Sequence, residues 1–479
     1  MRERMAEQAP LCGRRMAVRG DDAGLLHARA LLAALGAEVV DDIDNDVSGA
    51  ILADDSTARV PTVRPATVPA PIEWAGSGAM ALTGHRGGAP LLAPGAPASA
   101  VRGALLVFDL LSQLAHRPPG ALPDARMLGE RAALTGARRN APWSVGGAFR
   151  CLRAADGWLG ISLPRDDDHA LVPALVDDRA VTESWAAVAA WAAGTAVAGA
   201  VDRAQTLGIA AAAVPADRDE RAAAPLATHV GGRRRRTNRA VVVDLSALWA
   251  GPLCASLLHA AGARVIKVES VNRSDGARRG NQTFFDLLNH GHESVVIDLG
   301  TANGRAALAR LLCAADLVIE SARPRALRQL GIDADDFVTH GTSWVSITGY
   351  GRREASAHRV AFGDDAAAAA GLVGWTREGP VPCGDAIADP LAGVHAAAAA
   401  AAVLLDDHAH LVDLSMRDVA ASAAALPSEP AEVLAQGSGW VVRTECTTAV
   451  VAAPCARAPT GPARPPGADT ASVLDWLGC

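Results

Sequence analysis

Aromatic side chains are scarce in this chain. Phe, Trp and Tyr together make up 4% of the 479 residues, and Tyr350 is the single Tyr. Half of the residues are nevertheless hydrophobic, so Ala, Leu and Val must supply most of the core volume. A chain of this length exceeds the size at which one hydrophobic core usually stops growing. We therefore expect two or more domains in which many close-packed helices cover sheets.

Signals for metal binding, secretion and membrane insertion are also missing. The eight Cys residues stand singly and none forms a C-x-x-C pair, which argues against a zinc site or a disulfide framework. The N-terminus lacks the apolar core of a signal peptide, and no uninterrupted apolar run of about 18 residues stands out. Two His-x-His pairs, His290/His292 and His408/His410, could share a strand face but lack a matching carboxylate or Cys pattern. These absences predict a cytoplasmic protein with no metal and no membrane span.

An excess of basic charge is absent as well. The formal net charge is -7 and the pI is near 6.0, which gives no electrostatic reason to expect nucleic acid as a partner. The one basic run, Arg233 to Arg236, lies between a Gly pair and Thr237-Asn238. We expect residues 233–237 to form a solvated basic linker.

The sequence contains two internal echoes. Leu31 to Val40 (LLAALGAEVV) returns 226 positions later as Leu257 to Ile266 (LLHAAGARVI), and each copy indicates a helix end, a Gly-Ala turn and the start of a strand. A second set of identities lies 290 positions apart, and pairs Leu82, Gly84, Pro90 and Gly103 with Leu372, Gly374, Pro380 and Gly393. Because the offset grows by 64, we interpret residues 16–120 as an abbreviated copy and residues 238–420 as the complete one.

The complete copy alternates in the way that is typical of a parallel sheet with crossover helices. Pro252 suits the first turn of one helix and Thr301 is placed to cap another. Apolar, β-branched runs lie at 241–243, 265–266, 295–297, 317–319, 345–347 and 411–412. The predicted fold class is α/β, with a Rossmann-like parallel-sheet large domain and a smaller α/β domain.

These patterns divide the chain into segments. We assign residues 1–120 to the abbreviated copy and residues 121–232 to an arm (121–150) followed by the small α/β domain. Residues 238–420 form the complete large domain. Residues 421–479 are expected to be irregular, apart from a terminal helix between Asp469 and Leu477.

Five ordered blocks of the complete copy carry a resemblance. They are D-L-S with A-G-P and G-A-R-V-I-K-V-E at 244–269, then 289–299, 315–331, I-T-G-Y-G at 347–351, and G-D-A-I-A-D-P-L-A-G at 384–393. In this order the blocks resemble those of family III (CaiB/BaiF-type) CoA-transferases. Weaker likeness covers 149–164, 207–215 and 467–474, with the small-domain-like piece ahead of the large domain. The chain thus resembles a fused, rearranged pair of family units whose first unit lacks the catalytic block.

The resemblance implies that Asp389 is the catalytic residue. It matches the family's nucleophile, which attacks an acyl-CoA thioester to form a mixed anhydride that the CoA thiolate can attack in turn. The resemblance implies no cofactor, because CoA is a substrate and a small carboxylic acid is the acceptor. We expect Pro390 to start a helix with Asp389 extended before it, where the helix N-terminus stabilises negative charge. The structural alternative is that Asp389 is only an N-cap.

The resemblance also implies CoA contacts by Ala247, Leu248, Trp249 and Ala250, with Gly349 and Tyr350 near the thioester. Three positions depart from the family: Trp249 replaces a Gln of some members, His292 a common Lys, and Ser321-Ala322 an Asn-Phe pair. Replacement charge for the phosphates of CoA could come from Arg273, Arg278, Arg279 or Arg323.

Two further positions limit the function. Asp364 stands where the family's racemase branch has a His, so α-proton racemisation is not expected. In the abbreviated copy Ser99 stands where the complete copy has Asp389, so that copy is expected to serve packing or assembly.

One other function remains open, and a second is disfavoured. A degenerate acyl-CoA-binding or assembly protein would explain the altered contacts, whereas a nucleotide-binding dehydrogenase would need a G-x-G-x-x-G after the first strand, which is absent. A homodimer and a covalent pseudo-dimer both fit the resemblance.

Overall fold

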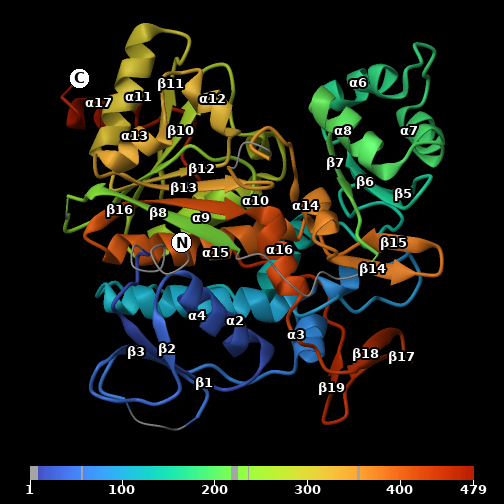
Figure 1. The fold of residues 1–479 in the computed structure, drawn as a ribbon, viewed down its shortest axis with the longest axis horizontal. Coiled ribbons are helices and arrows are strands. Elements are labelled where there is room, and N and C mark those ends of the chain that lie inside the picture. Colours follow the sequence, from blue (N-terminus) through green and yellow to red (C-terminus); the bar gives the residue numbers. More distant parts are fainter. Residues whose placement is uncertain (1–8, 55–57, 217–224, 236, 353–355, 479) are drawn as a thin grey trace.

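A seven-stranded sheet organises the larger part of the molecule (Figure 1). The computed structural model describes residues 9–54, 58–216, 225–235, 237–352 and 356–478. The order in the sheet is β11-β10-β9-β12-β13-β16-β8, and all neighbours are parallel except β8, which runs antiparallel to β16. The strands are β8 (Leu226–Arg233), β9 (Val241–Asp244), β10 (Arg264–Ser270), β11 (Glu293–Ile297), β12 (Leu317–Glu320), β13 (Ser343–Thr348) and β16 (His408–Ser415). The prediction of a mixed α/β protein with a parallel sheet is confirmed.

Helices cover both faces of this sheet because its strand residues alternate between two cores. Val242 of β9 packs into the core shared with α9 (Ala250–Ala260) and α15 (Ala388–Leu405). Val241 and Val243 point the other way, into a core with α11 (Ala302–Ala314), α12 (Pro324–Arg328) and α13 (Ala334–Thr339) on that face. Both faces of the strands are therefore buried, as expected for a parallel sheet.

Helix α15 lies at the centre of the molecule. Among the described residues it is the one helix long and apolar enough to cross a membrane, and 83% of it is buried inside the protein. Its Ala-rich surface lets neighbouring backbones approach closely, since a Cβ atom at Gly393 would lie 2.7 Å from the carbonyl oxygen of Ala250. Helix α15 packs between α9 and α4 (Pro97–Leu114), and so joins the two halves of the chain.

The N-terminal half contains a second, smaller parallel sheet. Its order, β2-β1-β3-β4, is the order of β10-β9-β12-β13 in the large sheet. The strands β1 (Arg15–Arg19), β2 (Glu38–Val40), β3 (Val47–Leu52) and β4 (Thr62–Val63) are covered by α2 (Ala23–Ala34) and α4. A Cβ atom at Gly103 of α4 would lie 2.4 Å from the Gly24 carbonyl oxygen, which repeats the contact of Gly393 with Ala250 at both sequence offsets. The echoes thus coincide with matching topology and contacts, while the duplication itself stays a prediction.

The small α/β unit predicted after the arm is a separate layer (Figure 1). An antiparallel sheet of β5 (Phe149–Arg153), β6 (Trp158–Ser162) and β7 (Ala210–Ala213) packs against α6 (Asp166–Val176), α7 (Ser184–Ala193) and α8 (Val197–Leu207). Leu159 and Ile161 of β6 belong to its own core, together with Val172, Val188 and Val201.

Two expectations about the connecting segments were wrong, and the arm contains secondary structure that had not been predicted. The stretch 420–465 is not irregular throughout, because it holds the end of α16 (Met416–Ala424) and a sheet of β17 (Glu432–Gln436), β18 (Gly439–Arg443) and β19 (Thr448–Val450). The arm contains the turn η2 (Ala125–Gly129) and helix α5 (Glu130–Thr135). The basic run is not a solvated linker: Arg233 ends β8, and the buried Arg234 donates to the Val403 and Asp406 carbonyls at the end of α15. Arg236 lies outside the described residues.

The remaining elements complete the surroundings of the large sheet. The predicted terminal helix is present as α17 (Thr470–Trp476), and Thr301 caps α11 by accepting from the Gly304 amide at 3.0 Å. The others are α3 (Ala70–Gly76), η1 (Met80–Leu82), η3 (Gly276–Arg279), α10 (Gln282–Asn289), α14 (Gly363–Ala369), β14 (Val373–Thr376) and β15 (Gly379–Pro382).

Candidate active site

Asp389 lies in the first turn of α15 and is partly accessible to solvent. The helix begins at Ala388 with Ile387 at the N-cap, so Asp389 is neither extended nor the cap, and both expectations were wrong. Asp and Pro are both favourable inside a first helical turn, which explains why the helix starts earlier than Pro390. The Asp389 carboxylate therefore lies at the positive end of a long buried helix.

The turn before α15 is held in a strained conformation. Ala386 has φ +45°, a left-handed value that a residue with a Cβ rarely adopts and that costs on the order of 1 kcal/mol. Two hydrogen bonds fix it: its amide donates to Asp364 Oδ1 at 3.0 Å, and its carbonyl accepts from the Asp389 amide at 2.9 Å. Asp364 and Asp389 are thus joined through a single backbone unit.

Several carboxyl groups share this small volume. The pKa of Asp389 is raised to about 7, chiefly by burial and also by the charges of Asp364 and Asp385. Burial and the Asp385 charge also raise the pKa of Asp364 to about 6. Gly363 allows close approach from α14, because a Cβ atom there would lie 2.2 Å from Asp389 Oδ2. The backbone of Gly363 hydrogen-bonds to Asp389 and favours its ionised form.

A cation from the arm opposes this negative charge. Arg131 of α5 binds Asp385 with both arms of its guanidinium group, through Nε at 2.9 Å and an Nη atom at 2.5 Å. The same guanidinium lies over the ring of Trp249, 4.8 Å from its centroid. Its charge lowers the pKa of Asp389. Sequence reasoning missed Arg131 because its segment has no counterpart in the five blocks and was interpreted only as an arm.

The predicted CoA-contacting loop follows β9. Leu248 has φ +71° and is 45% exposed, and Ala247 is partly exposed. Trp249 and Ala250 are buried, with Trp249 packed edge-to-face on Phe284 at 5.2 Å between ring centroids. Of the four loop residues predicted to contact CoA, only Ala247 and Leu248 therefore present an accessible side chain.

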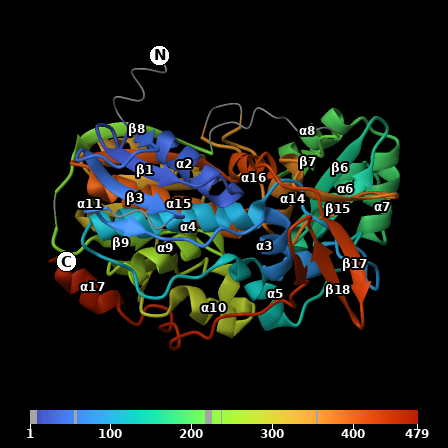
Figure 2. The same ribbon diagram turned by 90° about the horizontal axis from the view of Figure 1, so that it is seen from below.

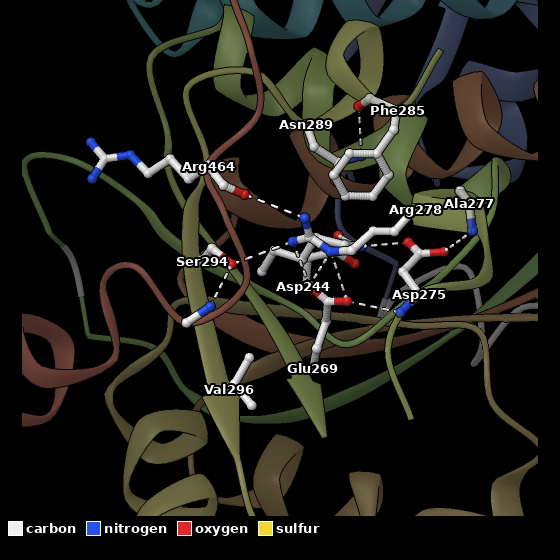
Figure 3. A network of polar contacts seen from close by, with 12 residues as sticks. Asp244, Glu269, Asp275, Ala277, Arg278, Phe285, Asn289, Ser294, Val296 and Arg464 are labelled. Carbon is white, nitrogen blue, oxygen red and sulfur yellow. Dashed lines mark hydrogen bonds and ion pairs between the residues drawn. The ribbon is translucent and has the colours of Figure 1, made fainter. Parts of the chain in front are cut away.

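A buried ionic network fixes that loop at the carboxyl ends of β9 and β10. The Lys267 ammonium lies 3.0 Å from Asp275 Oδ2 and 3.4 Å from Asp244 Oδ2, and Asp275 Oδ1 accepts from the Leu248 amide at 3.0 Å. Burial alone would lower the pKa of Lys267, but the two aspartates raise it overall. Figure 3 shows the adjoining part, in which Arg278 binds Glu269 and Glu269 accepts from the Asp275 amide.

Gly349 and Tyr350 follow β13 on the same edge of the sheet. The Gly349 carbonyl accepts from the Arg417 amide at 3.1 Å. The Tyr350 ring lies under the Arg359 guanidinium at 4.3 Å, and burial raises the pKa of its hydroxyl. That hydroxyl has no hydrogen-bond partner among the described residues. Strand β12 separates this pair from the loop after β9.

A cavity of about 420 Å³ lies where the small domain meets the large one. We call it the basic cavity because its three arginines outnumber its two aspartates, Asp167 and Asp168. Arg165 and Gln205 line it from the small domain, and Arg323, Arg325 and His358 line it from the large domain. Burial and the charges of Arg325 and Arg165 lower the pKa of Arg323, which indicates an excess of positive charge. Of the four arginines considered for phosphate binding, Arg323 is therefore the best placed, whereas Arg278 is occupied by Glu269.

The cavity and the carboxyl cluster are connected by one short segment. The Gln205 side chain donates to the Val360 carbonyl at 2.9 Å and accepts from the Val360 amide at 2.8 Å. His358 lines the cavity, and Gly363 contacts Asp389. The segment 358–363 thus leads from the basic cavity to the candidate nucleophile.

Of the two His pairs, only His408 and His410 lie on one strand, β16. His290 ends α10 and His292 lies in a turn before β11, so these two do not share a strand face. His292 is buried against His259 with ring centroids 5.3 Å apart. His410 is paired with Asp406 at 2.8 Å. Within the described ranges, no group of three or more His, Cys, Asp or Glu side chains is placed to hold a metal ion.

Comparison with known proteins gives partial matches. Succinyl-CoA–D-citramalate CoA-transferase of Chloroflexus aurantiacus is 31% identical over 175 residues, which are 34% of this chain and 44% of that protein. Succinate–glutarate CoA-transferase of Agrobacterium fabrum is 28% identical over 200 residues, 37% of this chain and 50% of that protein. The chain thus spans about half the length of these curated relatives. A crystal structure of Rv3272 from Mycobacterium tuberculosis matches with a TM-score of 0.40 and 29% identity, over 44% of this chain and 64% of that one.

The match to a family is confined to one part of the chain. Residues 239–437 match the family model of CoA-transferase family III. This range contains Asp389, the loop after β9 and the Gly349-Tyr350 pair, and it excludes Arg131 and the small domain. The matches support the resemblance to family III CoA-transferases for this segment of the chain.

Proposed function

We propose that this chain transfers CoA from an acyl-CoA thioester to a carboxylic acid through a covalent intermediate on Asp389. The observation that carries the proposal is a partly accessible carboxyl group in the first turn of α15 whose pKa is raised to about 7, in the segment that matches the family. Such a carboxylate is a stronger nucleophile than an ordinary one, and about half of it is ionised at pH 7.

The reaction consists of four acyl-transfer steps that involve the Asp389 carboxyl group. A carboxylate oxygen attacks the thioester carbonyl carbon, the C–S bond breaks, and CoA leaves as the thiolate. The thiolate attacks the Asp389 carbonyl of the mixed anhydride, which releases the donor acid and leaves an aspartyl-CoA thioester. The acceptor carboxylate attacks that thioester and again expels the thiolate. The thiolate then attacks the acceptor's acyl carbon, which forms the new acyl-CoA and frees Asp389. Charge balances at each step without a metal or redox cofactor.

The surroundings of Asp389 suit this chemistry. The N-terminus of α15 and the Arg131 guanidinium supply positive potential where negative charge develops. Because attack needs the ionised carboxylate, kcat/KM should rise as pH increases through about 7 and fall about tenfold per pH unit below it.

We assign the basic cavity to the phosphates of CoA. Arg323 and Arg325 would meet the phosphates from the large domain, whereas Arg165 on the small-domain side is already paired with Asp168. The exposed Leu248 offers apolar surface to the pantetheine arm, and Gly349 and Tyr350 would lie near the thioester. The partners are then an acyl-CoA and a small carboxylic acid.

The N-terminal half resembles the large domain in topology. We propose that residues 16–120 are an abbreviated copy of the large domain, since strand order and the Gly103 and Gly393 contacts correspond at the sequence offsets. The two copies pack through α4 and α15, as the halves of a covalent pseudo-dimer.

Trapping of the acyl-enzyme tests the function. Incubation with a panel of acyl-CoAs and hydroxylamine should leave a hydroxamate on Asp389, detectable by peptide mass spectrometry, and D389N should abolish it. The matched control is D335N, because Asp335 is likewise the second residue of its helix, α13, but is 69% exposed and outside the site. Acyl-CoA binding without adduct or turnover across the panel would instead identify a non-catalytic binding protein and overturn the proposal.

A further inference from the structure

Arg131 connects parts of the candidate site that come from different regions of the chain. Its guanidinium binds the Asp385 carboxylate in the turn before α15 and stacks on Trp249 at the start of α9. We propose that Arg131 is a positioning residue of this site, which fixes the Asp389 turn against the loop after β9 and supplies the positive charge that faces Asp389. The inference rests on the transferase function proposed above.

The fork of the guanidinium explains why an Arg is needed. Two parallel bonds to Asp385 and one stacked face on Trp249 fix both the position and the plane of the group. Asp385 immediately precedes the strained Ala386, so the ion pair restrains the turn whose carbonyl accepts from the Asp389 amide. A Lys could preserve the charge but neither the fork nor the stacked face.

The charges around Asp389 make the cation necessary. Asp364 and Asp385 face it from α14 and from the turn, and Asp365 lies one residue further along α14. The neighbouring thiols Cys151 and Cys383 are buried and their pKa values are raised, so they stay neutral and do not alter the charge of the site. Tyr350, near Asp365, also stays neutral because burial raises its pKa. Arg131 therefore offsets a group of carboxylates that would otherwise repel one another.

Helix α5 is itself firmly anchored. Glu130, next to Arg131, forms a two-pronged ion pair with Arg457 of the C-terminal segment at 2.5 and 2.9 Å. The Leu134 carbonyl accepts from the Asn281 side chain at 2.9 Å, and Figure 2 shows α5 beside α10. The arm thus holds Arg131 in place from a segment outside the range that matches the family.

A substrate-free titration tests the charge effect. The protein is labelled with carboxyl-¹³C aspartate, and the Asp389 resonance is identified by its loss in D389N. In R131M the midpoint of this resonance should move to higher pH by at least about one unit, a tenfold change in the ionisation constant. In D385N it should move to lower pH, and the double variant R131M/D385N should lie between the two. R126M is the matched control, because Arg126 is in the same arm but 63% exposed, and should leave the midpoint unchanged.

Kinetics test the positioning effect. R131K keeps a positive charge, so it should retain a midpoint near that of the wild type but lose at least about tenfold in kcat with a smaller change in KM. An unchanged midpoint in R131M, or wild-type kcat in R131K, overturns the inference even when the wild type forms the acyl-enzyme. If the midpoint shifts in R131M but the wild type forms no acyl-enzyme, the transferase function is overturned and the role of Arg131 is not. If R131M does not fold, R131K and D385N still decide the outcome.

Discussion

The N-terminal half (residues 16–120) and the complete half (residues 238–420) share a strand order, but they differ in the burial of one position. In the complete half, Asp389 lies at the start of α15 and is partly accessible, and Leu248 in the loop after β9 is exposed. In the N-terminal half, the positions that correspond by the two offsets are Ser99 on α4 and Asp22 before α2. Ser99 is fully buried and donates to Glu73 at 2.6 Å. The position is thus buried and hydrogen-bonded in the N-terminal half but partly accessible in the complete half.

Ser99 belongs to a buried ion-pair network in the N-terminal half. Arg102 of α4 binds Glu73 at 2.7 Å and Asp22 at 2.8 Å, and all three side chains are at most 15% exposed. The position that corresponds to Arg102 in the complete half is Ala392, which is too small to bridge anything. The comparison teaches that a framework of helix pairs over a parallel sheet does not itself make a site. A small residue in the helix and an open loop are also required.

Exchanging the two polar residues should have the largest effect. In the double variant S99D/D389S the carboxyl moves to the corresponding place in the N-terminal half, where Glu73 and the Arg102 network leave no room for substrate. We expect loss of at least about a thousandfold in kcat, as for removal of a nucleophile, and no hydroxylamine adduct at position 99. S99A alone should keep wild-type turnover. Adduct formation at position 99 would show that the N-terminal half retains an open site.

Opening the closed network should cost stability without costing activity. R102M leaves Glu73 and Asp22 buried without their cation, and breaking such a buried pair typically costs about 3 kcal/mol. We expect a lower midpoint in urea unfolding and a lower Tm, with unchanged kcat at temperatures where the variant is folded. R126M, which loses only an exposed ion pair with Asp124, should be within about 0.5 kcal/mol of the wild type. Equal stability of R102M and R126M would contradict the proposed role of the network.

The features that could be predicted from the sequence are those that depend on local pattern. Each β-branched run of the large domain is a strand, because strands buried on both faces need continuous apolar residues. Strand β8 was missed, because its sequence LATHVGGR is polar and Gly-rich and it becomes a strand only by pairing with β16 at the sheet edge. The β17 to β19 sheet was missed for a different reason, because the Pro, Ala and Ser of the surrounding stretch outweighed its short apolar runs such as Val441-Val442.

The candidate site could be predicted only in part, because part of it depends on distant contacts. Asp389 was identified from a motif, but its raised pKa comes from burial and from Asp364 and Asp385. Arg131 is 254 residues away from Asp385 in the sequence and belongs to no motif. Trp249 and Ala250 match the family by position, yet the core packing of α9 buries both. A residue's position in a motif indicates where its backbone lies in the fold, whereas the exposure of its side chain depends on which elements pack against it.

A smaller difference between the halves concerns acid stability. His27 of α2 is buried against His395 of α15 with their Nε2 atoms 2.6 Å apart, and His395 Nδ1 contacts the Leu391 carbonyl at 2.7 Å. Burial lowers the pKa of His395 to about 4 and lowers that of His27, so both are neutral in the folded protein. The unfolded chain binds protons near pH 6.5, and stability is therefore lost as pH falls from about 6.5 toward 4. The residue that corresponds to His27 in the complete half is Leu253.

The variant H27L places the complete half's residue in the N-terminal half. Because one of the two proton-binding imidazoles is removed, the free energy of unfolding should depend less on pH between about 4 and 6.5, with a slope smaller by up to one bound proton. Urea unfolding at several pH values measures that slope. It is read separately from the absolute stability, which also changes because His395 loses its partner. H290L is the control, since His290 lies at the end of α10 in a partly exposed position. A slope in H27L equal to that of the wild type would mean that the contact between α2 and α15 does not titrate in this range, and that other groups dominate acid unfolding.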